Sequence, residues 1–455
     1  RPRVGKTMEK NLTSGSVLKS IAYFSLPYLL SYFLQTLYGM ADLFIIGQFD
    51  GVASTTAVSI GSQVMHMLTV MIVGVAMGTT VTIGRAIGAN HPKDAARYIG
   101  NTVVLFMAGS VALAAVLLGL VRPIVGLVST PEEAVAGTVT YLTICFAGIP
   151  CITAYNIIAS IFRGLGDSKS PMYFIAVACV ANIGLDYLFM GAMGMGPAGA
   201  ALGTTLSQAI SVVLSLVVIL RRKSGIRLEK ADFKPNGKVL GEMLSIGLPV
   251  MFQDGFIQVS FMIITIIANQ RGLTDAAAVG IVEKIISFLF LVPSSLLSTV
   301  SALGAQNIGA GKHERVDTIL RYSICIGLGF GGVIALLMQF IAPSVIRPFT
   351  SDEAVVLAGA SYIRTYIFDC MFAGVQFSFS GYFCAYGKSG LSFLHNILSI
   401  LLVRVPGAYF GSKLFPDTLM PMGLAPAVGS LFSSVVCVLA YLWLKKQLVK
   451  EKPHV

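Results

Sequence analysis

The chain has 455 residues, of which 55% are hydrophobic and only 12% carry a charge, and its mean hydropathy is +0.80. A soluble globular domain carries roughly twice that share of charged side chains, so the composition excludes the soluble classes of enzyme and binding protein. It is typical instead of a polytopic helical membrane protein, in which each spanning segment satisfies its own backbone polar groups.

Apolar stretches about as long as a bilayer is thick recur along the whole chain. About 20 predominantly apolar residues suffice for one transmembrane helix. We predict twelve spans, at residues 17–42, 53–79, 98–121, 134–161, 171–190, 198–220, 240–269, 276–302, 318–341, 355–385, 390–411 and 421–444. The predicted fold class is therefore an all-α integral membrane protein with twelve transmembrane helices.

The basic residues are distributed unevenly between the two sides of these spans. Most of the 32 Lys and Arg residues fall on the side that holds both termini. The exceptions are Arg122, Arg271, Arg347 and Lys413 on the opposite side, and Lys284, Arg364 and Arg404 in the interior of spans. By the positive-inside rule, this predicts a multi-pass protein of the plasma (inner) membrane with both termini cytoplasmic. The net charge of +11 then lies against anionic lipid, and no nucleic-acid partner is needed.

The two halves of the chain repeat one unit at an offset of 221 residues, so that Ile87-Gly88-Ala89 falls on Ile308-Gly309-Ala310. The longest polar stretch, residues 221–238, lies between the halves. We predict an N-lobe at 1–220 and a C-lobe at 239–455, each with six helices. Because six is even, both lobes enter the membrane from the same side. They should be related by a pseudo-two-fold axis along the membrane normal, with substrate bound between them near the midplane.

Two acids in apolar spans of the first half are predicted to share one cation or proton site. Asn182 and Asp186 are four residues apart and face one side of the fifth span, and Asp42 lies in the first span. An ionised Asp near the bilayer centre costs roughly 2.5–3.5 kcal/mol on insertion scales, so such residues usually face a bundle interior or a wet cavity. The alternative is a capped polar residue near a helix end. The duplication places Ile263 opposite Asp42 and about Gly407 opposite Asp186, which favours a functional role for the acids.

The second half carries its own intramembrane acids, Asp254, Glu283 and Asp369. Glu283 and Lys284 are adjacent and point about 100° apart, so they cannot form a simple face-to-face pair. Each acid could instead pair with another helix or face a wet cavity, and both options remain open. We treat the three as candidates for lining a substrate cavity.

Pro27 and Pro249 fall near the middle of their spans. Proline lacks the backbone donor and its ring clashes with the preceding turn, so a kink is expected at each position. Kinks are common in membrane helices, and the two prolines are candidate hinges or ordinary bends.

No pattern for a cofactor or for catalysis stands out. The five histidines have no metal-ligand spacing, and residues 304–312 lack the spacing of a phosphate loop. No nucleophile and base form a recognisable constellation. We expect neither a cofactor nor enzymatic activity.

Several pieces, in this order along the chain, resemble the MATE (multidrug and toxic compound extrusion) transporters of bacterial type, over essentially the whole length. They are Leu26-Pro27 followed by Gln35, Tyr38 and Asp42, then Ala57-Val58, Gly84–Asn90 with its echo Ala305–Gly311, Phe162–Asp167, Asn182-x-x-x-Asp186 and Gly196–Ala200. The resemblance implies cation-driven export of diverse, often cationic, amphiphilic drugs.

The resemblance also implies a site. Residue by residue, the family's cation pocket falls on Asp42, Asn182, Asp186 and Thr204, with Asn156 and the cavity-lining Gln35 and Tyr38 nearby. Carboxylate, amide and hydroxyl oxygens would suit Na⁺, and two facing carboxylates would equally hold a proton. Some family members instead use acids in helices 7, 8 and 10, the regions that hold Asp254, Glu283 and Asp369 here.

The leading functional hypothesis is a monomeric secondary antiporter. It would export organic-cation or amphiphilic small molecules in exchange for Na⁺ or H⁺ by alternating access. The alternative is a flippase for lipids or lipid-linked oligosaccharides of the same wider superfamily, which should place Arg or Lys in its cavity. Apart from Lys19, Glu242 and Arg321, which lie within the first four residues of their spans, the spans offer five acids against three basic residues, which favours cationic cargo. A receptor or non-transporting scaffold would lack an inter-lobe cavity and ion-dependent flux.

Overall fold

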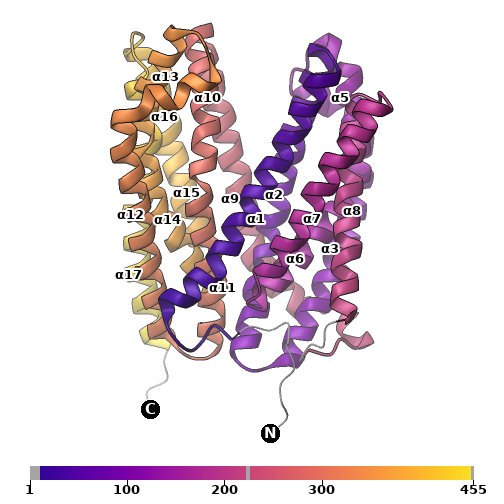
Figure 1. Ribbon diagram of the computed structural model, residues 1–455. Helices are drawn as coiled ribbons and strands as arrows, with labels where there is room; N and C mark the ends of the chain where they lie inside the picture. Colours follow the sequence, from indigo (N-terminus) through magenta and orange to yellow (C-terminus); the bar gives the residue numbers. More distant parts are fainter. Residues whose placement is uncertain (1–10, 222–225, 452–455) are drawn as a thin grey trace. The chain divides into compact units, whose positions relative to one another are not determined.

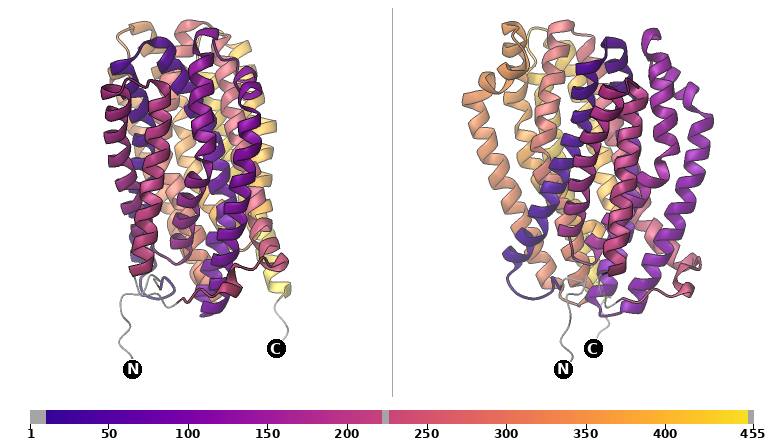
Figure 2. Two further views of the ribbon diagram at one scale, coloured as in Figure 1. Left: turned by 90° about the vertical axis from the view of Figure 1, so that its right-hand side faces the viewer. Right: turned by 45° about the vertical axis from the view of Figure 1, so that its right-hand side comes forward.

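A computed structural model describes residues 11–221 and 226–451, and all regular elements in these ranges are helices (Figure 1). Eleven helices are long and apolar enough to cross a membrane, and a bent pair of shorter helices supplies a twelfth span. The predicted fold class is confirmed. Two further views show the long helices of each part running side by side (Figure 2).

The first half of the chain forms α1 (Val17–Phe49), α2 (Val52–Gly88), α3 (Pro92–Gly119), α4 (Val121–Leu127), α5 (Val135–Ala147), α6 (Ile149–Gly164), α7 (Lys169–Asp186) and α8 (Pro197–Arg221). The second half forms α9 (Gly237–Asn269), α10 (Leu273–Leu289), α11 (Leu291–Gly309), α12 (His313–Ile346), α13 (Glu353–Tyr366), α14 (Phe368–Ala385), α15 (Ser389–Ser399), α16 (Val405–Leu414) and α17 (Met420–Glu451). Short 3₁₀ turns cover Glu132–Ala134, Lys230–Phe233 and Arg347–Phe349. Two π-helical turns, η2 (Tyr187–Ala192) and η5 (Ile400–Arg404), follow α7 and α15.

Several helices extend beyond the predicted spans. The first span was expected to end at residue 42 and the second at residue 79, whereas α1 continues to Phe49 and α2 to Gly88. Residues 43–49 (LFIIGQF) are mostly apolar, so the first span was ended too early, whereas α2 remains helical through the polar Thr80, Thr82 and Arg85. Span boundaries from composition are therefore shorter than the helices.

The fourth predicted span, residues 134–161, is broken. Helices α5 and α6 meet at Gly148 with a bend of 51° between the two segments. A Cβ on Gly148 would overlap the side chain of Thr205 on α8, so only glycine lets α8 approach this closely. Pro150 follows in the first turn of α6 and has no N–H to continue the hydrogen-bond ladder of α5. The close approach and the missing donor together explain the bend.

The described chain divides into two compact units. The N-unit comprises the described parts of residues 1–14, 23–251 and 305–311, and the C-unit those of residues 15–22, 252–304 and 312–455. Helix α1 therefore changes unit shortly before Pro27, and α9 changes unit shortly after Pro249. Both helices are continuous through their prolines.

The repeated Ile-Gly-Ala motifs meet within the N-unit. A Cβ on Gly88 would overlap the carbonyl of Gln306, and a Cβ on Gly309 would overlap the carbonyl of Arg85. The 221-residue offset relates Gly88 to Gly309 and Arg85 to Gln306, so the two contacts are equivalent. Glycine is required at both positions because backbone, and not a movable side chain, lies opposite each one.

Candidate functional site

The predicted cation site is assembled from three helices of the N-unit. Asp42 lies on α1, Asn182 and Asp186 lie one turn apart on α7, and Thr204 lies on α8. Asp186 is the last residue of α7 before the π-helical turn η2. Such turns are rare and are often found at functional sites, because the inserted residue changes the direction in which neighbouring side chains point.

Asp42 is held by donors from two other helices. Asn182 Nδ2 donates to Asp42 Oδ1 at 3.1 Å, and Thr204 Oγ1 donates to Asp42 Oδ2 at 2.7 Å. The Asp42 side chain is 3% exposed. The structure thus brings these three predicted residues into direct contact, and each oxygen of the Asp42 carboxyl has one donor.

Asp186 lies beside Asp42 but lacks the hydrogen-bond donors that Asp42 has. It is fully buried, and among the described residues no donor is within hydrogen-bond distance of either carboxyl oxygen. Its ionisable neighbour is the carboxyl group of Asp42. The Oδ1 atom of Asn182 is also buried without a donor. Asp186 Oδ1 and Asn182 Oδ1 both lie within 4 Å of the position that a Cβ on Gly203 would take, so two of these acceptors are close together. A buried acceptor that lacks a partner is costly unless a cation or a proton meets it.

Sequence reasoning missed two residues that shape this site. A Cβ on Gly203 would overlap Asp186 Oδ1, so the backbone of α8 lies directly against the carboxyl group. Ser207, one turn further along α8, contacts the hydroxyl of Tyr38 at 2.7 Å. The only sequence signal was their place on the polar face of α8, next to Thr204.

The remaining predicted residues of the N-unit differ in their relation to the site. Tyr38 donates to the carbonyl of Thr204 at 2.9 Å and so fixes α1 against α8 beside the carboxyl groups. Asn156 donates to the carbonyl of Ile152, one turn earlier in its own helix α6. Gln35 is half-buried on α1. No hydrogen bond described in the structure joins Asn156 or Gln35 to the acids.

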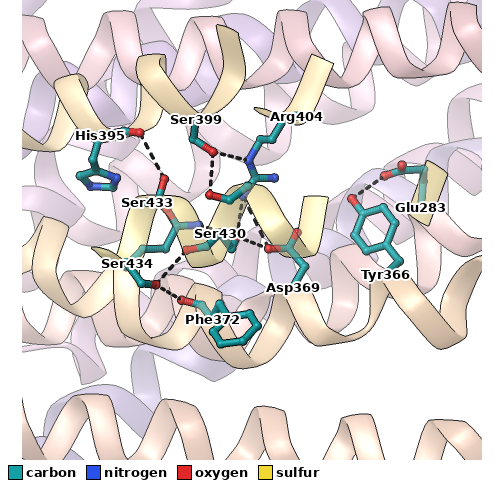
Figure 3. Close-up of polar contacts among 12 residues, drawn as sticks. Glu283, Tyr366, Asp369, Phe372, His395, Ser399, Arg404, Ser430, Ser433 and Ser434 are labelled. Atoms are coloured by element: carbon teal, nitrogen blue, oxygen red, sulfur yellow. Dashed lines mark hydrogen bonds and ion pairs between the residues drawn. The ribbon is translucent and has the colours of Figure 1, made fainter. Parts of the chain in front are cut away.

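Two of the three candidate acids of the C-unit, Asp369 and Glu283, lie close enough to interact electrostatically. Asp369 on α14 is 1% exposed and forms an ion pair with Arg404 of η5, with 3.6 Å between Oδ1 and Nη2. It also accepts a hydrogen bond from Ser430 on α17. Figure 3 shows these three side chains converging, with Glu283 and Tyr366 to one side.

Glu283 on α10 lies near this ion pair and interacts electrostatically with both Asp369 and Arg404, whereas Asp254 lies on another helix. The hydroxyl of Tyr366 is 3.5 Å from Glu283 Oε2, whereas Glu283 Oε1 has no described partner. Asp254 lies on α9 beside Gln253. Lys284 is exposed although the neighbouring Glu283 is half-buried, which agrees with the expectation that they do not pair. Sequence analysis had placed Arg404 within a span but had not predicted its partner.

Within the described residues, no group of three or more His, Cys, Asp and Glu side chains is placed to hold a metal ion. The N-unit site combines two carboxyl groups with an amide and a hydroxyl. This is a set of oxygen atoms suited to a hard monovalent cation or to a shared proton, and not to a transition metal.

Comparisons with known proteins agree with this architecture. The sequence matches the MatE family twice, over residues 27–188 and 249–410, once in each half of the chain. It is 30% identical to the probable multidrug resistance protein YpnP of Bacillus subtilis (strain 168), over 97% of this chain and 99% of that protein. It is 24% identical to the probable multidrug resistance protein NorM of Thermotoga maritima, over 96% of this chain and 95% of that protein.

Solved structures share the fold. A MATE protein crystallised in its straight conformation superposes with a TM-score of 0.90 at 22% identity, covering 99% of this chain and 100% of the other. An outward-facing MATE family transporter of the MOP superfamily superposes with a TM-score of 0.89 at 22% identity and the same coverage. The repeated family match and the relative at 30% identity, which spans nearly the whole chain, are consistent with the duplicated helical fold. The chain belongs to the MatE family, the multidrug and toxic compound extrusion transporters, and is a multi-pass membrane transporter and not an enzyme.

Proposed function

We propose that the protein is an antiporter that exports cationic or amphiphilic small molecules in exchange for Na⁺ or H⁺. The exchange would proceed by alternating access, with the protein acting as a monomer in the plasma (inner) membrane and with both termini in the cytoplasm. The names of the relatives, which are multidrug resistance and multidrug export proteins, support the substrate class. The distribution of basic residues supports the orientation.

The observation that carries the proposal is the set of unmet acceptors at Asp186. Two carboxyl groups lie together in a dry part of a membrane protein, and only Asp42 has hydrogen-bond donors. Two such groups cannot both stay ionised without a counter-charge. A cation or proton that binds there and later leaves would supply that charge, which is what a coupling ion must do.

The donor set accommodates either coupling ion. For Na⁺, the ligands would be the carboxyl groups of Asp42 and Asp186, the Oδ1 atom of Asn182 and the hydroxyl oxygen of Thr204. For H⁺, the two carboxyl groups would share the proton. In both cases the free energy by which the ion stabilises one conformation over the other cannot exceed the difference between its binding free energies for the two conformations.

Helix α1 offers a route from ion binding to conformational change. Asp42 belongs to the proposed ion site, and Pro27 lies about four turns earlier in the same helix. Unit membership changes inside α1 and inside α9, close to Pro27 and Pro249. We infer that both prolines act as hinges, and that ion binding at Asp42 and Asp186 alters the bend of α1 and narrows the drug cavity. Drug and ion would then exclude each other because the ion-bound conformation leaves less room for the drug, even though the two do not share the same ligands.

The proposal is tested in proteoliposomes with a fluorescent organic cation such as ethidium as the exported probe. Na⁺ and proton gradients are imposed separately on the wild type, on Asp186→Asn and on a matched control, Asp94→Asn, which removes an exposed acid at the start of α3. We expect one gradient to drive efflux in the wild type and the control, and neither gradient to drive it in Asp186→Asn. Normal gradient-driven efflux by a well-expressed Asp186→Asn protein would reject the proposal.

A further inference from the structure

The exposed face of α10 carries small and polar residues. Ala277, Gly280, Lys284 and Ser287 are all exposed. Their spacing of three or four residues places them on one side of the helix. The opposite side is apolar and buried in the C-unit. Lys284 therefore stands on an open helix face, with a small residue one turn before it and another one turn after it.

This face differs from the exposed faces of other helices in the C-unit. Helix α12 exposes Leu336 and Phe340, and α17 exposes Leu439 and Leu442, as expected for surfaces in contact with apolar lipid tails. From residue 274 to residue 310, by contrast, no large hydrophobic side chain is exposed. The exposed face of α10 thus lacks the side chains that a lipid-facing surface would have.

Lys284 lies deep within its span. Helices α10 and α11 together form one candidate span, Leu273–Gly309. From Leu273 to Lys284 the helix rises about 17 Å, and the hydrocarbon core of a bilayer is about 30 Å thick. A lysine at this depth is costly in lipid. Such residues face a bundle interior or a water-filled cavity, and they mark substrate or ion pathways.

Packing by another helix is the alternative explanation for the small residues on this face, since transmembrane helices approach closely at Gly, Ala and Ser. A helix in that position would bury Lys284, and a buried ammonium group needs a counter-charge. None of the ion pairs formed by the described residues involves Lys284. A Cβ on Gly280, one turn away, would meet nothing within 4 Å. The face is therefore open and suited to water.

The two acids of α10 do not supply a negative partner for Lys284. Asp275 forms an ion pair with Arg271, with 2.9 Å between Oδ2 and Nε. Glu283 points toward Tyr366, whose hydroxyl is 3.5 Å from Oε2 (Figure 3). A negative charge beside Lys284 can instead be supplied by a molecule that binds to the open face.

We propose that Lys284 is a specificity-determining residue that binds a carboxylate or a similar anionic group of an amphiphilic substrate. The inference rests on the proposed export function and refines it, because it adds zwitterionic molecules to the cationic ones. A lysine ammonium group is a compact charge with three donors on a flexible stem. It can therefore reach an anionic group without requiring one fixed orientation.

The residues around Lys284 leave room for the rest of such a molecule. Ala277 and Gly280 have little or no side chain, and Ser287 Oγ donates to the carbonyl of Glu283 at 2.8 Å. The hydroxyl group of Ser287 is thus held against its own helix. An apolar ring system can lie along these three residues while its anionic group contacts the ammonium group of Lys284.

An anionic lipid offers similar chemistry in its headgroup. Headgroups lie outside the hydrocarbon core, however, and Lys284 is about 17 Å along the helix from Leu273. This depth favours a substrate that enters the protein over a lipid that stays at the membrane surface. Lipid binding is therefore one outcome of the test that would overturn the assignment.

The test compares two dyes that differ in a single charge. Tetramethylrhodamine carries a free carboxylate and is zwitterionic, whereas its methyl ester is a cation with the same ring system. Binding of each dye is titrated by fluorescence anisotropy, with the protein in nanodiscs of phosphatidylcholine and with empty nanodiscs as the blank. The proteins are the wild type, Lys284→Met, Lys284→Arg and a matched control, Lys413→Met, which removes an exposed lysine of α16.

We expect Lys284→Met to weaken binding of the free acid about tenfold, the size of one hydrogen bond to a charged group, and to leave binding of the ester within about twofold. Lys284→Arg keeps the charge and should retain most of the affinity for the acid, and Lys413→Met should bind both dyes like the wild type. Equal weakening of both dyes in Lys284→Met, or unchanged affinity for the acid, would overturn the inference. Loss of spin-labelled phosphatidylglycerol binding in Lys284→Met, with both dye affinities unchanged, would assign the face to lipid and would also overturn it.

Gradient-driven efflux of the same dyes separates this inference from the proposed export function. Export of the ester by a protein in which Lys284→Met binds the acid normally would reject only the role of Lys284. Weakened binding of the acid alone in Lys284→Met, in a protein that exports neither dye, would reject the exporter and support Lys284 as the anion-binding residue.

Discussion

Asp186 of the N-unit and Asp369 of the C-unit are buried to the same depth but have different partners. Asp186 is fully buried and has no described donor on either oxygen, and its ionisable neighbour is a second acid. Asp369 is 1% exposed, pairs with the guanidinium group of Arg404 and accepts a hydrogen bond from Ser430. Both sites lie beside a π-helical turn, η2 after α7 and η5 after α15.

The difference supports our proposal that a mobile ion binds at Asp186 and not at Asp369. A buried charge is tolerated when it is paired and hydrogen-bonded, and removing one partner is then strongly destabilising. Asp369 has its own counter-charge on Arg404, so this one ion pair is stable without an external ion. Asp186 lacks a comparable basic partner among the contacts described, and we therefore propose that it depends on an ion that arrives from outside.

The largest effect is expected from Asp186→Asn. The neutral amide removes the charge that the coupling ion must balance, so gradient-driven export should fall to the level of empty liposomes. The cost of burying that charge disappears as well, so the melting temperature should hold or rise. Efflux and thermal unfolding are measured on the same preparation. A large loss of stability would mean that Asp186 is a structural group, as we propose for Asp369.

Arg404→Met should show the opposite behaviour. It leaves Asp369 buried without its counter-charge, and removing one partner of such a pair costs about 3–5 kcal/mol. Unfolding is followed with a thiol-reactive dye, since five of the seven cysteines are buried. Lys413→Met, which removes an exposed charge on α16, is the matched control. The double variant with Asp369→Leu should recover much of the loss, and equal stability of all four proteins would contradict the contrast between the units.

Asp42→Asn distinguishes two ways in which ion and drug can compete. If the ion acts through the shape of α1, ethidium should bind nearly as well as to the wild type, but its affinity should no longer depend on pH or Na⁺. If the drug binds these carboxyl groups directly, its affinity should fall strongly. Fluorescence titration at several pH values and Na⁺ concentrations measures both quantities. Strong weakening would reject the shape mechanism, and ion dependence that persists in the double variant with Asp186→Asn would move coupling to the C-unit.

The smallest effect is expected from Gly203→Ala. The added methyl group overlaps Asp186 Oδ1, and the carboxyl group can move away at modest cost. We expect apparent ion affinity to fall about tenfold, which corresponds to about 1.4 kcal/mol, with little change in melting temperature. Gly184→Ala on α7 is the control, because its added Cβ would meet open space. Equal ion dependence in both variants would show that the ion does not contact Asp186.

The sequence predicted the fold well because a membrane helix must be long enough to cross the bilayer, so apolar stretches of that length identify the spans. It did not predict the break at Gly148, which depends on how closely α8 approaches. The helical spacing of Asn182 and Asp186 was readable because both lie on one helix. The pairing of Asp369 with Arg404 was not, since these residues lie on different helices and either could have paired elsewhere. The two π-helical turns could not be predicted from the sequence either, because a π-helical turn changes the direction of side chains without a characteristic composition.

The central claim is that the N-unit pair takes up a coupling ion while the paired acid of the C-unit does not. Counting the Na⁺ ions or protons that purified protein binds at saturation tests this directly. We predict that Asp186→Asn binds one ion fewer per chain than the wild type and that Asp369→Asn binds the same number. An unchanged count in Asp186→Asn, or the loss of one ion in Asp369→Asn, would contradict the account.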